Sequence, residues 1–221
     1  MRQASTLATE VKICGINSNE ALNAAQEAGA EYLGFVFFPK SPRHVSVEQA
    51  AALAKQAKSG IKKVGLLVNA SDDEIRQITE QVPLDILQLH GGETPERVAE
   101  IKRNFGLEIM KVIKVSEQKD FETVSVFEEV SDRLLFDAKP PKDLKDALPG
   151  GNAISFDWRL LAGKSWKRPW MLAGGLNCEN IQDAVRISGA PAVDVSSGVE
   201  DKPGLKSIEK IHTFTSKAHN T

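Results

Sequence analysis

Residues 170–176, WMLAGGL, and residues 192–198, AVDVSSG, are two short apolar runs that end in small residues rich in glycine and serine. Between them lies CENIQDAVRIS, a helical pattern that starts after Asn177 and stops at Gly189. Strand, helix, strand in this order is the unit of a parallel sheet, because parallel strands need a long crossover connection. The unit predicts a fold of the α/β class.

Similar apolar runs occur eight times along the chain. They predict strands at Val11–Cys14, Tyr32–Phe37, Val64–Val68, Leu84–Leu89, Ile109–Ile113, Arg133–Asp137, Trp170–Ala173 and Ala192–Ser196. Most gaps between them carry helix signals, such as the pair Ser71 and Glu74 or Thr94 ahead of Pro95. Eight strand–helix units in 221 residues predict a single (β/α)8 TIM barrel.

A doubly wound open sheet is the structural alternative to the barrel. Such a sheet usually has fewer strands and carries the pattern GxGxxG after the first one, and no such pattern follows Val11–Cys14. No change in composition marks a domain boundary, so we expect one domain over residues 1–221, with a short N-terminal extension at residues 1–10. The stretch at residues 139–152, rich in Pro, Gly and Lys, is expected to form a long active-site loop.

The composition excludes several classes of protein. The chain has 28 Lys and Arg against 30 Asp and Glu, a near balance that argues against a dedicated nucleic-acid binder. Its two cysteines form neither a disulfide framework nor a zinc site by themselves. The first ten residues lack the apolar core of a signal peptide, and no run approaches the length of a membrane span. We therefore expect a cytoplasmic protein with no membrane or nucleic-acid partner, and a monomer by default.

Four polar side chains lie at the ends of predicted strands, where a TIM barrel places its chemistry. Strand alternation points them into the mouth of the barrel; they are Cys14, His90, Asp137 and Asp194. Polar groups at the ends of several otherwise apolar strands are hard to explain by packing alone. Taken singly, each has a plainer interpretation: a buried structural thiol, a hydrogen-bonded core histidine, and carboxylates that cap a loop or pair with an interior lysine.

Small residues after the last two strands predict an anion site. Gly174 and Gly175 follow the seventh strand, and Ser197 and Gly198 follow the eighth. Such residues let backbone N–H groups approach a ligand, and these two loops are where TIM barrels often hold a phosphate. The alternative is that they only form tight turns. Arg43, after the second strand, is a candidate for binding a second anion such as a carboxylate.

Five motifs at these positions resemble those of phosphoribosylanthranilate isomerases. They are KICGI (12–16), GFVF (34–37) running into SPR (41–43), QLHG (88–91), LAGGL (172–176) and DVSSGVE (194–200). The resemblance implies an Amadori rearrangement of a small phosphorylated aminosugar, N-(5-phosphoribosyl)anthranilate, to 1-(2-carboxyphenylamino)-1-deoxyribulose 5-phosphate, an aldose–ketose isomerisation in tryptophan biosynthesis. The alternative is a non-catalytic phosphate-binding barrel, or a diverged one that acts on another phosphorylated sugar.

This chemistry needs a proton donor at the ring oxygen and a base at C2, and it needs neither a redox cofactor nor a metal. Asp137 is the candidate general acid, a role that the resemblance also assigns to it, and it must stay protonated near neutral pH. Cys14 is the candidate general base, which requires a modest lowering of the thiol pKa from about 8.5. We further expect Arg43 to hold the anthranilate carboxylate, Asp194 to orient substrate hydroxyls and His90 to line the anthranilate side.

One departure from the family pattern lies in the loop before Phe156. The family usually carries Gly-Gly-Thr-Gly there, whereas this chain has Gly150-Gly151-Asn152-Ala153. We expect the change to alter the loop that closes over the site, while the candidate acid and base are both retained.

Overall fold

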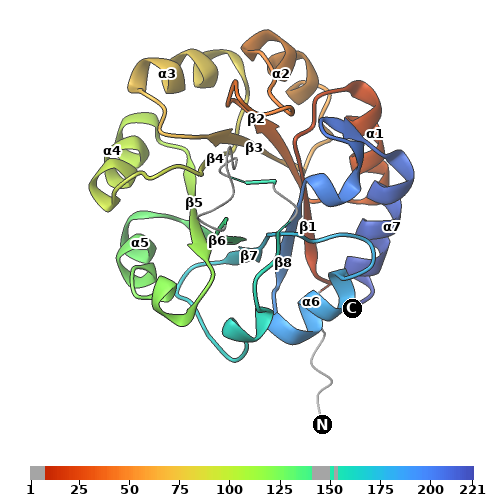
Figure 1. Cartoon of the computed structure of the whole chain (residues 1–221). Helices are drawn as coiled ribbons and strands as arrows, with labels where there is room; N and C mark the ends of the chain where they lie inside the picture. Colours follow the sequence, from red (N-terminus) through yellow and green to blue (C-terminus); the bar gives the residue numbers. More distant parts are fainter. Residues whose placement is uncertain (1–7, 141–149, 152–153) are drawn as a thin grey trace.

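Eight parallel strands close into a barrel in the order in which they occur along the chain (Figure 1). The computed structural model describes residues 8–140, 150–151 and 154–221. The strands are β1 (Glu10–Cys14), β2 (Tyr32–Val36), β3 (Lys62–Leu67), β4 (Ile86–Leu89), β5 (Glu108–Val115), β6 (Arg133–Ala138), β7 (Trp170–Leu172) and β8 (Ala192–Val195). The barrel closes where β1 pairs with β8, with Lys12 opposite Asp194. The predicted TIM barrel is confirmed, and β1 begins within the expected N-terminal extension, at Glu10.

Helices form a layer around the barrel, as Figure 1 shows. In the described residues they are α1 (Asn19–Ala28), α2 (Val47–Ala54), α3 (Asp72–Gln81), α4 (Pro95–Phe105), α5 (Val124–Val130), α6 (Ile181–Ser188) and α7 (Ile208–His219), with short 3₁₀ turns η1 (Gln118–Phe121), η2 (Trp158–Leu160) and η3 (Ser197–Val199). Ser71 and Glu74 form the predicted capping box of α3, and Thr94 caps α4 ahead of Pro95. Within the part of the chain that is described, no helix is long and apolar enough to cross a membrane.

The connection from β6 to β7 departs from the expected strand–helix repeat. Its described part contains only the 3₁₀ turn η2, where a regular strand–helix repeat would place an α-helix. Aromatic rings cover the barrel here: Trp166 packs on Phe136 with ring centroids 5.0 Å apart, and Trp170 meets Phe136 edge-on at 5.6 Å. Large rings bury much apolar area, so this packing stabilises this side of the barrel. Their packing fixes β6, the strand that carries Asp137.

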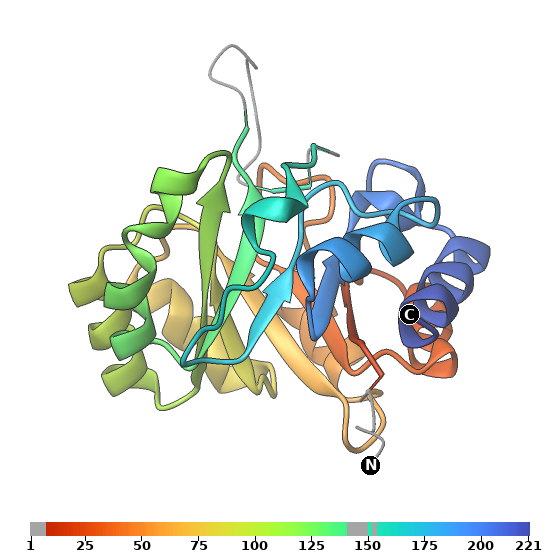
Figure 2. The ribbon, with the colours of Figure 1, turned by 90° about the horizontal axis from the view of Figure 1, so that it is seen from below.

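Side chains alternate along each strand between the barrel interior and the helices. Ile13 packs in the core between strands and helices, whereas Met110 and Leu135 help to fill the barrel interior. Cys14, at the carboxyl end of β1, lies in a separate small cluster with Leu66. In Figure 2 the carboxyl ends of the strands lie on the side away from the N-terminus. The polar residues at those ends therefore share one face of the molecule.

Candidate active site

A cavity opens at the carboxyl ends of the strands and gathers nearly all of the predicted site residues. Its polar and glycine lining comprises Cys14, Ser41, Arg43, His90, Asp137, Gly150, Gly151, Gly174, Gly175, Asp194, Ser196 and Ser197. Gly198 lies just outside this lining, where it packs closely against the backbone of Leu176 in the loop after β7. Among residues 8–140, 150–151 and 154–221, no three His, Cys, Asp or Glu side chains gather closely enough to hold a metal ion.

Cys14 is almost fully buried, with its thiol against Gly34 of β2. A Cβ atom at position 34 would lie 3.0 Å from Cys14 Sγ and 3.1 Å from Lys12 Nζ, so glycine makes room for both groups. Burial raises the pKa of the Cys14 thiol, and the nearby cations Lys12 and Lys206 only partly oppose this effect. The expectation of a lowered thiol pKa is therefore wrong for this structure, because desolvation outweighs the two cations.

Lys12 and Asp194 form a buried ion pair next to Cys14. Lys12 Nζ donates to Asp194 Oδ1 at 2.8 Å, and the lysine side chain has no exposed surface. Burial opposes the charge of Lys12, but the negative charges of Asp194 and the Cys14 thiolate outweigh burial and raise the lysine pKa. The ammonium therefore stays charged beside the thiol. Asp194 lines the cavity, as predicted, and its carboxylate is engaged by an interior lysine.

Asp137, near the end of β6, is hydrogen-bonded to His90, which directly follows β4. Asp137 Oδ2 lies 3.1 Å from His90 Nε2, and both side chains are buried. Gln88 Nε2 lies 3.2 Å from His90 Nδ1, so both ring nitrogens of His90 have a polar neighbour. The histidine therefore orients the carboxyl group of Asp137, a contact that sequence reasoning missed.

Two glycines from the loop after β6 lie over the cavity. A Cβ atom at Gly150 would come within 2.6 Å of His90 Cε1. A Cβ atom at Gly151, where φ is +74°, would lie 2.6 Å from Arg43 Nη1. Both positions need glycine, because any side chain would collide with a site residue. The departure from the family pattern at positions 152–153 lies outside the described residues.

The loops after β7 and β8 present backbone groups to the cavity. Gly174 and Gly175 have positive φ values of 90° and 64°, and Asn180 Nδ2 holds this turn by donating to the Gly175 carbonyl at 2.9 Å. Ser197 opens the 3₁₀ turn η3 after β8. Within the described residues, the N–H groups of these two glycines and of Ser197 donate no hydrogen bond to another backbone group. N–H groups at such turns and helix starts are suited to bind a phosphate.

Arg43 reaches the cavity from the loop after β2 and is held by Glu200. Its Nε and Nη2 donate to Oε1 and Oε2 of Glu200 at 2.8 and 2.9 Å, a bidentate pair that orients the guanidinium. Lys206 donates to the same carboxylate at 2.8 Å. No role was predicted for Glu200 or Lys206, and the available signal was two charged residues flanking a Pro-Gly turn shortly after the last barrel strand.

The sequence as a whole matches one family of known proteins. The family model for N-(5'phosphoribosyl)anthranilate (PRA) isomerase matches residues 11–217, almost the whole chain. The chain belongs to the PRA isomerase family. The curated PRA isomerase of Paracoccus denitrificans is 52% identical over 212 residues, which cover 96% of this chain and 98% of that protein. The prediction from the five motifs is thereby confirmed.

Solved PRA isomerases share the fold of this chain. The crystal structure of the Thermotoga maritima PRA isomerase has a TM-score of 0.85 at 35% identity and covers 96% of this chain and 100% of that one. Another PRA isomerase structure, with a TM-score of 0.81 at 32% identity and the same coverage, is a complex with reduced 1-(o-carboxyphenylamino)-1-deoxyribulose 5-phosphate. The likeness therefore extends over the whole barrel.

Proposed function

We propose that the chain catalyses the Amadori rearrangement of N-(5-phosphoribosyl)anthranilate, with Cys14 as general base and Asp137 as general acid. One observation carries the proposal: a single cavity holds a thiol, a carboxyl group and two kinds of anion-binding group. The first anion-binding group is the guanidinium of Arg43, and the second is the backbone of the loops after β7 and β8. The substrate carries a carboxylate and a phosphate, with its reacting carbons between them.

The first step acts on the ring oxygen of the ribose. Asp137 donates its proton to this oxygen as the C1–O bond breaks, and the lone pair of the amine nitrogen forms a C1=N bond. The products are an open-chain iminium and an ionised Asp137. The hydrogen bond between His90 Nε2 and Asp137 Oδ2 orients the acid before this step and stabilises its carboxylate afterwards.

The second step removes the proton from C2. The Cys14 thiolate takes this proton, and the C2–H electron pair forms a C1=C2 bond while the C1=N pair returns to nitrogen. The resulting enol takes a proton at C1 from the Cys14 thiol, and its hydroxyl proton passes to the Asp137 carboxylate, which gives the ketone and restores both residues. The electrons stay within the substrate throughout. Lys12 favours the reactive form of the base, because its ammonium lowers the thiol pKa against the effect of burial.

The two anions of the substrate determine how it is oriented. We assign the phosphate to the backbone of Gly174, Gly175 and Ser197, with Gly198 completing the turn, and the anthranilate carboxylate to Arg43. Asp194 is placed to contact a substrate hydroxyl, since its side chain lines the cavity while one oxygen is bound to Lys12. Such positioning turns two weakly reactive groups into an effective acid–base pair.

The proposal is tested by mixing the protein with freshly prepared N-(5-phosphoribosyl)anthranilate and following the anthranilate-type fluorescence. We expect the fluorescence to fall at a rate proportional to protein concentration. A flat trace from properly folded protein would contradict the proposal and favour a non-catalytic barrel, or one that acts on another phosphorylated sugar.

We further propose that the chain is a monomer. In the described part of the chain, the exposed large apolar side chains lie on four different elements, as expected when no single large patch is formed. They are Val126 on α5, Ile187 on α6, Leu205 on β10 (Leu205–Lys206) and Ile208 on α7. Light scattering during size-exclusion chromatography should give the mass of one chain, and twice that mass would contradict the proposal. The cytoplasmic location stays a prediction from the sequence.

A further inference from the structure

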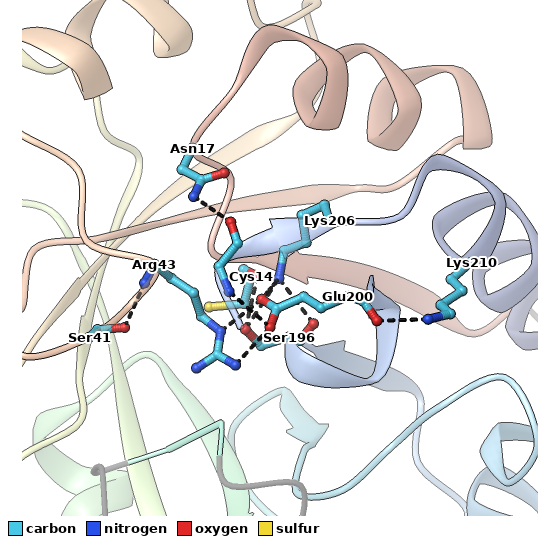
Figure 3. Close-up of polar contacts among 9 residues, drawn as sticks. Cys14, Asn17, Ser41, Arg43, Ser196, Glu200, Lys206 and Lys210 are labelled. Atoms are coloured by element: carbon cyan, nitrogen blue, oxygen red, sulfur yellow. Dashed lines mark hydrogen bonds and ion pairs between the residues drawn. The ribbon is translucent and has the colours of Figure 1, made fainter. Parts of the chain in front are cut away.

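A buried cluster of three charged side chains lies beside the cavity and takes no part in the proton transfers (Figure 3). Arg43 donates to both carboxylate oxygens of Glu200, and Lys206 Nζ donates to Glu200 Oε1 at 2.8 Å. All three side chains are at most 5% exposed. Two cations share one carboxylate, so the cluster holds one net positive charge at the wall of the cavity.

Lys206 also contacts the loop on the phosphate side. Its Nζ donates to the carbonyl of Ser196 at 3.0 Å and to Ser196 Oγ at 3.4 Å, and the same hydroxyl donates to the Cys14 carbonyl at 3.1 Å. Together with Glu200, these oxygens give Nζ three acceptors, the number that the three N–H bonds of an ammonium can use. Burial lowers the pKa of Lys206, but this geometry favours the charged form.

A short hairpin of β9 (Glu200–Lys202) and β10 positions the cluster. Lys206 lies directly opposite Glu200 in the antiparallel register, so the two side chains leave the same face of the hairpin. At its turn, the Gly204 carbonyl accepts a hydrogen bond from Asn17 Nδ2 at 2.8 Å, which ties the hairpin to the loop after β1. The Gly204 N–H donates to Glu200 Oε2 at 3.3 Å. The hairpin thus presents both charges to the cavity wall.

We propose that Lys206 is a positioning residue that links the two anion-binding parts of the site. On one side it holds Glu200, which fixes the guanidinium of Arg43. On the other side it holds the backbone of Ser196, which leads directly into Ser197 and the phosphate loop. The inference rests on the proposed function, because it takes Arg43 and this loop to bind the two anions of one substrate.

Removal of the Lys206 ammonium would weaken both anion-binding parts of the site, the guanidinium of Arg43 and the phosphate loop. Among the residues that the structure describes, Glu200 would keep Arg43 as its one buried cationic partner, and the remaining pair would lose the net positive charge that attracts an anionic substrate. The Ser196 carbonyl would lose its donor, which leaves the backbone before the phosphate loop less firmly held. Lys206 does not contact the reacting carbons in this arrangement, and its effect on the pKa of Cys14 is smaller than that of Lys12, so substrate binding should suffer more than the chemical steps.

Steady-state kinetics and phosphate binding test this link, with Lys206→Met compared against Lys210→Met. Lys210 is the matched control because it binds the same hairpin, through the Glu200 carbonyl at 2.7 Å, from an exposed position outside the cluster. We expect Lys206→Met to raise KM by about tenfold, or about 1.4 kcal/mol, with a smaller change in kcat. Calorimetry with inorganic phosphate should show a similar loss of affinity, while Lys210→Met should change neither quantity by more than about twofold.

A double variant tests whether Lys206 acts through Arg43. If it does, Arg43→Ala and Lys206→Met together should raise KM by less than the product of their separate effects, because the first change already removes the group that Lys206 helps to hold. Full multiplication of the two effects would show that the residues act independently and would contradict this part of the inference.

The link from Lys206 to the two anion sites is overturned if folded Lys206→Met keeps the KM and the phosphate affinity of the wild type, or if it lowers kcat alone. If Lys206→Met does not fold, Lys206→Gln, which keeps hydrogen-bond donors but not the charge, is measured in the same way with the same expected losses. Failure of the proposed function is distinguishable, because phosphate binding does not require turnover. A wild type that binds phosphate but leaves N-(5-phosphoribosyl)anthranilate unchanged would refute the isomerase assignment and still allow the calorimetric comparison.

Discussion

Cys14 and Asp137 lie in one cavity but in different surroundings, and this difference suits them to opposite roles. The thiol lies against Gly34 and a buried ammonium, whereas the carboxyl group is bonded to His90. We expect Cys14→Ser and Asp137→Asn each to lower kcat by about 10²–10⁴-fold, the usual effect of a positioned acid or base. Circular dichroism should show an unchanged fold in both variants. Near-wild-type turnover of either folded variant would remove that residue from the mechanism.

The thiol of Cys14 also carries a prediction about pH. Because burial raises its pKa, the thiol should be half ionised only above the ordinary value of 9.0, so the thiolate that acts as the base is a minor species near neutral pH. The rate of alkylation by iodoacetamide, measured against pH in a Cys178→Ser background, reports this titration since only the thiolate reacts. The expected midpoint lies above 9.0. A midpoint at or below that value would mean that Lys12 and Lys206 outweigh burial.

Strand alternation was enough to predict which side chains enter the mouth of the barrel, since every second residue faces inward. It could not predict their partners. The contact between His90 and Asp137 joins β4 to β6, and the bond between Lys206 and Ser196 joins two positions of one loop region. Such contacts depend on the three-dimensional positions of the loops, which no periodic pattern encodes.

Asp120, in the 3₁₀ turn η1, links the carboxyl end of β5 to the carboxyl end of β6, the strand that carries Asp137. Asp120 Oδ2 accepts from the N–H groups of Ser116 and Glu117, and Oδ1 binds Lys139, which follows β6. Although burial opposes the charge, these bonds lower the pKa of Asp120 from 3.8 to about 2. A carboxylate with a lowered folded-state pKa stabilises the fold above its unfolded value of 3.8, and this contribution is lost as pH falls toward 2.

We therefore expect Asp120→Asn to lose less stability than the wild type on acidification. Urea unfolding at about pH 6 and about pH 3 gives the two free energies needed for each protein. Equal losses in both proteins would show that the contacts of Asp120 do not contribute to acid sensitivity.

The strand–helix repeat predicted the barrel because each unit has its own start and stop signals, as Ser71 and Thr94 show at α3 and α4. It failed in the described part of the connection between β6 and β7, which contains a 3₁₀ turn and the rings of Trp166 and Trp170 and no α-helix. Aromatic residues close together in sequence do not reveal whether they lie on a helix or pack from a loop. The hairpin after β8 was missed because its strands are only three and two residues long.

For the whole molecule, the closure of the barrel depends on the seam between β1 and β8. The buried pair of Lys12 and Asp194 lies across this seam. Lys12→Met should lower the free energy of unfolding by about 3–5 kcal/mol, because it leaves a buried carboxylate without its partner. Lys12→Met with Asp194→Asn should recover much of this loss, since neither group is then charged. Urea unfolding measures both changes, and a stable Lys12→Met single variant would contradict this view of the seam.

We propose that one cavity binds both anions of the substrate and places its C2 carbon at Cys14. A crystal structure of this chain with reduced 1-(o-carboxyphenylamino)-1-deoxyribulose 5-phosphate tests this most directly. We expect the phosphate at the N–H groups of Gly174 and Ser197, the carboxylate at Arg43, and C2 in contact with Cys14 Sγ. A ligand bound in the reverse orientation, or with C2 out of reach of the thiol, would contradict the account.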